Sequence, residues 1–405
     1  MPVLFRKSFD PTVPSTEFFQ QWSKPSDVFS LLLILGGDVV ARALAQLVGS
    51  RITPVAFSFG WVAYAISAVV NAVGENRLMP TADCTCQVIN GQSGYIRSNS
   101  SWVIGRIVRD FEVWMDGGQA NGPIRKRLEE IIDDQRKAMK ASNPPPMAGL
   151  CVSVYKALEA QPGHPGHDRV YFVGFASMAL QLALAAIPCG IYGDWSILLV
   201  TMAGISLTLA TGALPQWKTE KWACRRKTEK TIILTRGNGN QHVIVIIGDG
   251  KGLDLEDLSA AYSRFSPSPV TRIAVVLLAA LWVLLLITAA GISENTWFLL
   301  GVGAIGILDN IYVAGASRSP KDFGIPLEFI RVIAHHRVMQ TLFDVERLYP
   351  RVGKSMLATF FPGELRKDEI NKWSEFDEIA RNLETQKAKD KAVQWEAKQG
   401  KQQAN

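Results

Sequence analysis

The sequence predicts an all-α membrane bundle of six transmembrane helices in three hairpins, with a small cytosolic α+β portion from the long loops. Hydrophobic residues make up 48% of the 405 residues, and they gather in six blocks separated by charged segments. Each block holds roughly 20 residues, enough for a helix to cross the hydrocarbon of a bilayer. The blocks lie at 28–48, 54–74, 170–191, 195–215, 270–291 and 296–316.

Short connectors join the blocks in pairs and divide the chain into seven segments. Transmembrane hairpins are expected at 28–74, 170–215 and 270–316. A cytosolic N-terminal segment is expected at 1–27, cytosolic loops at 75–169 and 216–269, and a cytosolic helical tail at 317–405. The first block begins too late and is too extended for a cleaved signal peptide, so it is expected to remain in the protein.

The distribution of basic residues predicts the orientation in the membrane. The three connectors inside the hairpins hold one basic residue, Arg51, whereas the two long loops hold about twenty. Because Lys and Arg accumulate on the cytoplasmic side, the long loops and both termini are expected in the cytosol, with the protein in the endoplasmic reticulum membrane. The formal charge of +6 follows from this asymmetry and indicates contact with anionic lipid headgroups, and no nucleic-acid motif accompanies it.

The long loops carry strand patterns. CQVIN, GQSG and YIRSN predict a strand, a turn and a strand, and TIILT, RGNGN and HVIVIIG predict a second hairpin because β-branched runs flank a glycine–asparagine break. The two hairpins could join into one small cytosolic sheet. SSWVIGRIVRDFEVWM predicts an amphipathic helix along the headgroups, and GDGKG, which lacks the Walker pattern, indicates a simple turn.

The cysteine and histidine patterns predict no disulfide framework, no metal site and no cofactor. The five cysteines are an odd number, and four of them lie in segments expected in the reducing cytosol. Cys84 and Cys86 are separated by one residue, which is a poor spacing for zinc. The histidine pairs in GHPGHD and VIAHHRV lack a convincing set of further ligands.

Polar residues recur on one face of several predicted spans. Helical spacing places Asp38, Arg42 and Gln46 together in the first span. Uncharged polar residues in such stripes often serve only to join helices, but an ionisable group at bilayer depth costs at least ~2.5–3.5 kcal/mol on insertion scales and is usually retained for a function. The other stripes contain Tyr64, Asn71 and Glu75 in the second span, Gln181 in the third, and Asp309, Asn310 and Tyr312 in the sixth.

An acid enclosed by apolar helices suggests acid–base chemistry. Desolvation favours the neutral form of an enclosed carboxyl, so Asp309, which has no basic partner within its span, could donate a proton. Arg42 could hold Asp38 ionised for orientation or proton return, or the pair could be a structural clamp, and which acid donates stays open. Nearby aromatic rings could stabilise carbocations or anchor the helices at the interface. The candidate catalytic residues are Asp38, Asp309, Arg42 and Glu75, and the candidate substrate-binding residues are Asn71, Tyr64, Trp61, Gln46, Gln181, Asn310, Tyr312 and Trp282.

Several stretches carry a resemblance to known proteins. GGDVVARALAQ, ALPQWKTEKWACRR, LTRGNGNQHVIVI, NTWFLLGVGAIGILDNIYVAG and GIPLEF resemble a widespread group of fungal multipass membrane proteins, and this group is similar to the integral-membrane terpene cyclases of meroterpenoid pathways, of the macrophorin and ascofuranone type. The resemblance implies acid-initiated, metal-independent carbocation cyclisation of a lipid-soluble prenylated small molecule, an isomerase or lyase reaction. It carries no catalytic role onto a particular residue.

Two other classes of function stay open. In a small-molecule or ion transporter or channel, the same polar stripes would line a path, and Asp38 or Asp309 would relay ions or protons. In a non-catalytic membrane scaffold, the cytosolic hairpins and the charged tail would recruit partners. The sequence leaves the substrate and the oligomeric state open.

Overall fold

A computed structural model describes residues 36–50, 52–75, 77–119, 121–139, 149–163, 166–260 and 268–403. The chain forms two compact units, each assembled from three separated segments. Unit 1 consists of Met1–Pro80, Pro165–Lys221 and Ser263–Ala316, and unit 2 consists of Thr81–His164, Trp222–Tyr262 and Ser317–Asn405. The predicted segment 1–27 and the start of the predicted helix 28–48 lie outside the described residues.

The prediction of an all-α bundle with six membrane-spanning helices is wrong. The structure is 59% helical but contains a six-stranded mixed sheet. Within the described residues, three helices are long and apolar enough to cross a membrane, and a fourth span results if one bent helix pair is counted together. The sequence pattern overestimated the spans because it measured apolar length alone and not where the helices break.

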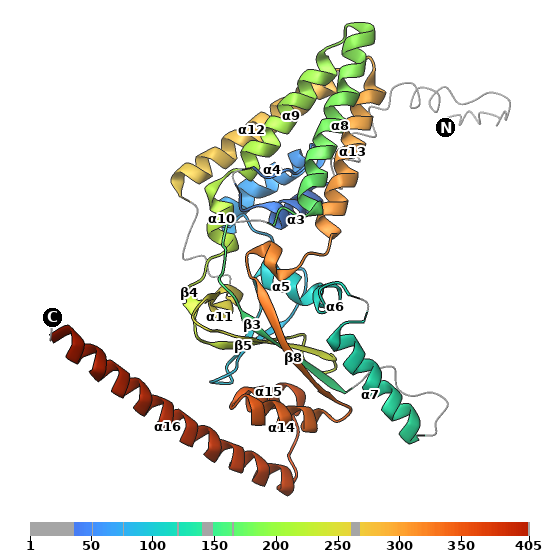
Figure 1. Cartoon of the computed structure of the whole chain (residues 1–405). Helices are drawn as coiled ribbons and strands as arrows, with labels where there is room; N and C mark the ends of the chain where they lie inside the picture. The colour runs from blue at the N-terminus through green and yellow to red at the C-terminus, as the bar shows by residue number, and fades with distance from the viewer. Residues whose placement is uncertain are drawn as a thin grey trace, which may run out of the picture. The chain divides into compact units, whose positions relative to one another are not determined.

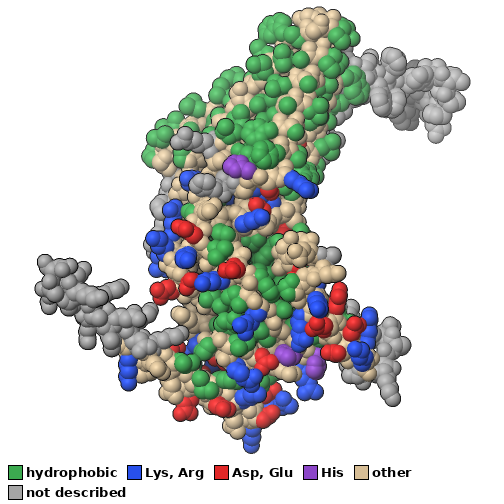
Figure 2. All heavy atoms as spheres, viewed as in Figure 1, with side chains coloured by type: hydrophobic (Ala, Val, Ile, Leu, Met, Phe, Trp, Pro, Cys, Tyr) green, Lys and Arg blue, Asp and Glu red, His purple; other side chains and the backbone are tan. Residues whose placement is uncertain are grey.

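Unit 1 is built from helices (Figure 1). Two long hairpins correspond to the predicted second and third hairpins, and Figure 2 shows hydrophobic side chains gathered over them, as expected of surfaces that face lipid. The elements are α3 Gly37–Leu47, α4 Gly60–Val70, the π-helical turn η1 Asn71–Glu75, α8 Arg169–Tyr192, α9 Ser196–Gly212, α10 Pro215–Lys221, α12 Pro269–Ala290 and α13 Thr296–Gly315.

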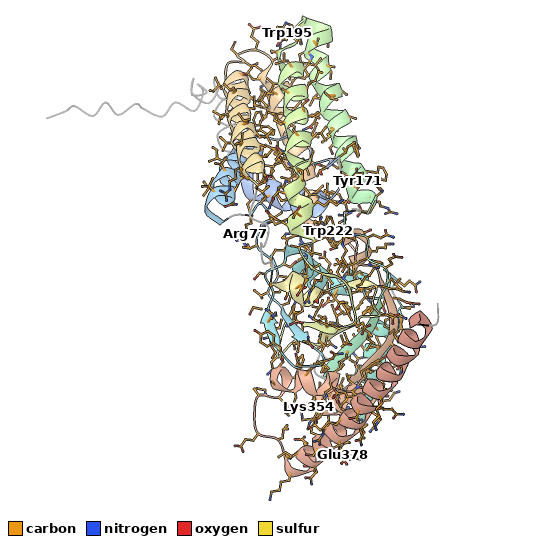
Figure 3. The ribbon with its side chains drawn as sticks, turned by 90° about the vertical axis from the view of Figure 1, so that its left-hand side faces the viewer. Arg77, Tyr171, Trp195, Trp222, Lys354 and Glu378 are labelled. Atoms are coloured by element: carbon orange, nitrogen blue, oxygen red, sulfur yellow. The ribbon has the colours of Figure 1, made fainter. Side chains whose placement is uncertain are left out.

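Local sequence sets the ends of the long helices. The Asp168 carboxylate accepts from the Tyr171 N–H and caps α8, and the Ser268 hydroxyl accepts from the Thr271 N–H ahead of Pro269 at the start of α12. Gly193, with a φ of 69°, ends α8 in the left-handed region. Trp195 therefore lies at the tip of the α8–α9 hairpin, at the opposite end of the helices from Tyr171 (Figure 3).

In the described parts of the predicted helices at 28–48 and 54–74, the chain forms two short helices with extended chain between them. Helices α3 and α4 have 11 residues each, or about 16 Å, whereas the hydrocarbon core is about 30 Å thick. Residues 52–58 are not helical. Pro54 explains the break, because proline cannot donate a helical hydrogen bond and disfavours the α conformation in the preceding Thr53.

Unit 2 is built around a mixed sheet with strand order β2-β1-β5-β6-β3-β8. The two predicted hairpins are present as β1–β2 and β5–β6, and β1 pairs with β5 to join them. The sequence did not predict β3, which pairs parallel to β6, or β8, which pairs antiparallel to β3. The strands are β1 Gln87–Asn90, β2 Ile96–Ser98, β3 Leu150–Ala157, β4 Arg226–Thr228, β5 Thr231–Thr235, β6 His242–Ile247, β7 Gly252–Leu253 and β8 Leu327–His335.

Helices complete the core of unit 2. A cluster of buried side chains from β1, β3, β5, β6 and β8 packs against apolar residues of the C-terminal helices, including Leu342, Met356 and Trp373. The predicted helical tail thus contributes to the core through α14, α15 and the start of α16. The helices are α5 Trp102–Arg109, α6 Phe111–Trp114, α7 Pro123–Met139, α11 Leu255–Ser259, the 3-10 helix η2 Pro320–Phe323, α14 Val338–Leu348, α15 Val352–Phe360 and α16 Lys367–Gln403.

Candidate functional site

The extended segment at 52–58 lies inside unit 1. Its backbone is not part of a helix or a sheet, although apolar side chains surround it. Thr53, Val55, Ala56, Phe57 and Ser58 are all buried. Backbone N–H and C=O groups that are buried without a helix or sheet ladder must find other hydrogen-bond partners. The polar side chains of the surrounding helices supply them.

Three side chains donate to the carbonyls of this segment. Gln181 of α8 donates through Nε2 to the Phe57 carbonyl at 2.6 Å and to the Val302 carbonyl of α13 at 2.9 Å. Asn310 of α13 donates through Nδ2 to the Ala56 carbonyl at 3.2 Å and to the Ser58 hydroxyl at 3.1 Å. The Trp61 indole N–H donates to the same Ala56 carbonyl at 2.9 Å. These bonds hold the segment between α8, α13 and α4.

Glycines in the long helices make room for the segment. A Cβ on Gly174 of α8 would lie 1.8 Å from the Pro54 carbonyl oxygen, and one on Gly306 of α13 would lie 1.7 Å from the Phe57 carbonyl oxygen. A Cβ on Gly204 of α9 would lie 2.6 Å from the Phe57 ring. Small residues allow close approach of backbones in membrane helices, and here the approaching backbone is the extended segment.

Asp309 joins the same cluster from α13. Its side chain is buried, with 5% of the residue exposed, and its Oδ1 accepts from the Ser177 hydroxyl of α8 at 3.0 Å. The Ala56 backbone N–H faces the same carboxyl. Among the described residues, Asp309 forms no ion pair with Lys or Arg. The Asp309 carboxyl is therefore buried among neutral groups.

Three oxygen atoms of this cluster lack a donor. Asp309 Oδ2, Gln181 Oε1 and Asn310 Oδ1 are buried and have no hydrogen-bond partner in the described part of the chain. Buried polar atoms are normally paired, so each such atom calls for an explanation. A carboxylate oxygen and two amide oxygens are the atoms with which proteins bind hard cations, and a carboxyl can also take up a proton.

Aromatic rings stack beside the cluster. Trp282 of α12 is nearly parallel to two other rings: Trp61, at 5.3 Å between ring centroids and 12°, and Phe57, at 6.0 Å and 15°. Tyr64 meets Trp61 edge-on at 5.6 Å. The Trp282 side chain is fully buried within this group of rings.

The other predicted site residues lie elsewhere in unit 1. Asp38 and Arg42 form an ion pair at 3.0 Å on the outside of α3, with side chains 72% and 47% exposed. Gln46 donates to the Ala316 carbonyl, and Tyr312 faces outward from α13. Asn71 and Glu75 bound the π-helical turn η1, and the Glu75 side chain lies outside the described atoms.

Sequence reasoning missed the partners that hold α3 in place. Lys221, at the end of α10, is buried and donates through Nζ to the carbonyls of Gln46 at 3.1 Å and Val48 at 2.8 Å. A cation at this position satisfies carbonyls that the end of α3 leaves unpaired. The only signal in the sequence was the proline at 54, which marks a break between the two apolar blocks but does not name the residues that cap it.

Comparisons with known proteins give no match: no family model, no curated protein and no solved structure is similar to this chain. The function is therefore argued from the geometry of the cluster around residues 52–58. This cluster brings together Asp309, Asn310, Gln181, Trp61 and Trp282 of the predicted site residues.

Proposed function

We propose that unit 1 is a membrane transport element for protons or small cations, in which the extended segment 52–58 and Asp309 lie on the path. One observation carries this proposal. Three buried oxygens, from Asp309, Gln181 and Asn310, accept no hydrogen bond in the described part of the chain, and they belong to side chains that surround the non-helical segment 52–58. The same geometry would serve a general transporter or channel, as the sequence left open.

The position of the cluster along the helices supports this proposal. Gln181 is the thirteenth of the 24 residues of α8, and Gly306, which touches the Phe57 carbonyl, is the eleventh of the 20 residues of α13. Asp309 and Asn310 are the fourteenth and fifteenth residues of α13, so the cluster extends from the middle of helices long enough to cross a bilayer toward the C-terminal end of α13. Non-helical backbone at such depth is tolerated only where protein buries it or a cavity adjoins it, and it is common in channels and transporters.

The chemistry of the cluster also supports transport. An ionisable residue inside a membrane usually marks an ion or proton pathway. Asp309 is not neutralised by a cation in the described residues, in contrast to Asp38 with Arg42, so its carboxyl can exchange a proton or a bound cation. The unpartnered amide oxygens of Gln181 and Asn310 belong to the same cluster and are of the kind that bind cations.

Chain connectivity supports four crossings of the membrane. The sheet of unit 2 combines β1 and β3 from before α8, β5 and β6 from between α9 and α12, and β8 from after α13. These strands can pair only if each helical hairpin returns the chain to the side from which it started. We therefore count α9 and α10, bent by 44°, as one span, and infer that the basic side carrying the sheet is cytosolic, with the endoplasmic reticulum as the expected membrane.

Terpene cyclisation is the second candidate, and the aromatic stack beside a buried acid favours it. Acid-initiated cyclisation of a prenylated substrate needs a proton donor next to ring faces that stabilise cations. Trp282 and Trp61, however, turn their faces to each other, so a substrate would have to separate them. Asp38, the expected partner for proton return, forms its ion pair on the outside of α3. Transport therefore fits the geometry better.

Reconstitution into liposomes tests the transport proposal. We expect the purified chain to carry a gradient-driven flux of protons, Na⁺, K⁺ or Ca²⁺, measured with entrapped indicator dyes, and Asp309→Asn to reduce this flux at least tenfold. Glu294→Gln, an exposed acid in the α12–α13 turn, is the matched control and should leave the flux unchanged. Flux equal to that of empty liposomes for all four ions would overturn the proposal.

Microsomes separate the two candidates. If the chain is a cyclase, membranes that contain it should convert a farnesylated or epoxyfarnesylated phenol into a cyclic isomer of equal mass, detected by chromatography and mass spectrometry. Conversion that is lost in Asp309→Asn, together with an absence of ion flux, would replace the transport proposal by the second candidate.

A further inference from the structure

We propose that a basic groove in unit 2 binds the phosphate-bearing headgroup of an anionic membrane lipid. The groove has a volume of about 440 Å³ and is built on β4 and the turn that follows it. It is lined by Gln92, Arg225, Arg226, Lys227, Thr228, Glu229, Lys230 and Asp254. This site is separate from the cluster around Asp309, but its assignment to a lipid rests on the proposed count of α9 and α10 as one membrane span.

The charges that line the groove leave a basic surplus. Four lining residues are basic and two are acidic. Arg225 and Lys230 are already paired with acids. Both contact the Asp254 Oδ2, at 3.4 Å and 3.0 Å, and each has a second acidic partner, Asp257 for Arg225 and Glu256 for Lys230. Arg226 and Lys227 are exposed and form no ion pair in the described part of the chain. Their charges remain available to an anion.

The backbone of β4 is irregular at the same two residues. The pairing of β4 with β7 shifts register between Arg226 and Thr228, so Lys227 falls outside the ladder. Lys227 also has a φ of 64°, in the left-handed region that a residue with a side chain rarely adopts. Irregular strands and unusual backbone conformations often occur beside binding sites, and this irregularity coincides with the unpaired basic residues.

The position of the groove in the chain identifies the ligand as a lipid. Arg225 follows Lys221, the last residue of α10, by four residues, which can span at most about 14 Å. Basic clusters directly after a membrane span attract anionic lipids, by about fivefold in affinity for each residue near the surface. A nucleotide is a poorer candidate, because the neighbouring GDGKG turn lacks the Walker pattern.

The full chain in a neutral detergent allows a direct measurement. Native mass spectrometry should show that phosphatidylserine and a phosphatidylinositol phosphate bind the protein at least tenfold more tightly than phosphatidylcholine does. The double variant Arg226→Gln/Lys227→Gln should weaken binding of the anionic lipids about 25-fold, since two basic residues are lost. Rising salt should weaken the wild-type interaction.

The matched control is the double variant Arg136→Gln/Lys137→Gln, which removes an adjacent, exposed basic pair at the end of α7. It should bind lipid as the wild type does. Both double variants should keep the elution volume and melting temperature of the wild type, which would exclude unfolding as the cause of weaker lipid binding. Three results would each overturn the proposal: equal binding of anionic and neutral lipids, equal loss in both double variants, or binding of inorganic phosphate alone as tight as that of the lipid.

Discussion

Two buried aspartates, one in each unit, have very different surroundings. Asp309 in unit 1 contacts the Ser177 hydroxyl and backbone, and the described residues place no cation beside it. Asp254 in unit 2, with 2% of the residue exposed, caps α11 and pairs with Lys230 and Arg225. Both carboxyls are withdrawn from water, but only the charge of Asp254 is compensated.

This difference indicates what each aspartate does. Breaking a buried ion pair leaves an uncompensated charge and destabilises the fold, so Asp254 and its basic neighbours have a structural role. Asp309 has only neutral partners, and a change in its charge does not break an ion pair. In this second environment a residue can take up and release a proton or a cation without breaking an ion pair. The following predictions test the contrast in order of expected effect.

The largest loss of stability is expected near Asp309, where the backbone of α13 lies against the backbone of the segment 52–58. Gly306→Ala places a Cβ 1.7 Å from the Phe57 carbonyl oxygen, which no rotamer can relieve, so the loss should exceed the roughly 1–3 kcal/mol typical of overpacking. Gly315→Ala, in the same helix with open space around the added Cβ, is the matched control. Melting in detergent, followed by size-exclusion chromatography, should show a large loss only for Gly306→Ala. Similar melting of the two variants would mean that the segment 52–58 does not lie against α13.

The second largest loss of stability is expected at Asp254, the buried aspartate that pairs with Lys230 and Arg225. Asp254→Ala removes the cap of α11 and leaves Lys230 without one of its partners, so we expect a loss of ~2 kcal/mol, the upper range for a helix cap. Asp249→Ala removes an exposed ion pair with Lys156 and should change stability by about 0–1 kcal/mol. Denaturant titration followed by tryptophan fluorescence measures both. Equal losses would remove the distinction between buried and exposed carboxyls in unit 2.

The third effect is a pH dependence of stability that comes from the ion-paired acid Asp257. The hydrogen bond from Arg225 lowers the pKa of Asp257. Burial acts in the opposite direction but has the smaller effect. Because the folded-state pKa is depressed, the stabilisation is fully present above the ordinary value of 3.8 and is lost as the pH falls through the lower folded-state value. Asp257→Asn should therefore be less sensitive to acid than the wild type in melting experiments below pH 4. An unchanged acid sensitivity would show that Arg225 does not hold this carboxyl.

The smallest effect on stability is expected at Asp309. Asp309→Asn keeps an oxygen that can accept from the Ser177 hydroxyl, and it breaks no ion pair. The change in stability should therefore be smaller than that of Asp254→Ala, while ion flux is lost. A melting temperature that falls as far as that of Asp254→Ala would assign Asp309 a structural role.

The sequence predicted those parts of the fold that depend on local patterns. Predicted spans at 170–191 and 270–291 agree closely with α8 and α12, and both strand hairpins were found from β-branched runs around glycine and asparagine. The short helices α3 and α4 were missed, because their apolar composition matches that of a span and only Pro54 indicates the break. Strands β3 and β8 were missed because their pairing joins residues far apart in the chain.

The candidate site was predicted in part for a related reason. Asp309, Asn310 and Gln181 stood out because polar groups inside apolar helices are rare, and the structure brings them together. Asp38 and Arg42 stood out equally, yet they pair with each other on the outside of α3. Spacing along one helix shows which residues share a face, but it does not show whether that face turns inward. The backbone carbonyls of residues 52–58 also belong to the site, and no pattern of side chains in the sequence indicates this.

The central claim is that the Asp309 carboxyl exchanges a proton or a cation within unit 1. Infrared difference spectroscopy of the reconstituted chain, recorded between two pH values and with or without added Na⁺ or Ca²⁺, measures this exchange directly. We expect a carboxyl band that changes with pH or with the cation in the wild type and in Glu294→Gln, and that is absent in Asp309→Asn. Identical difference spectra for the wild type and Asp309→Asn would contradict it.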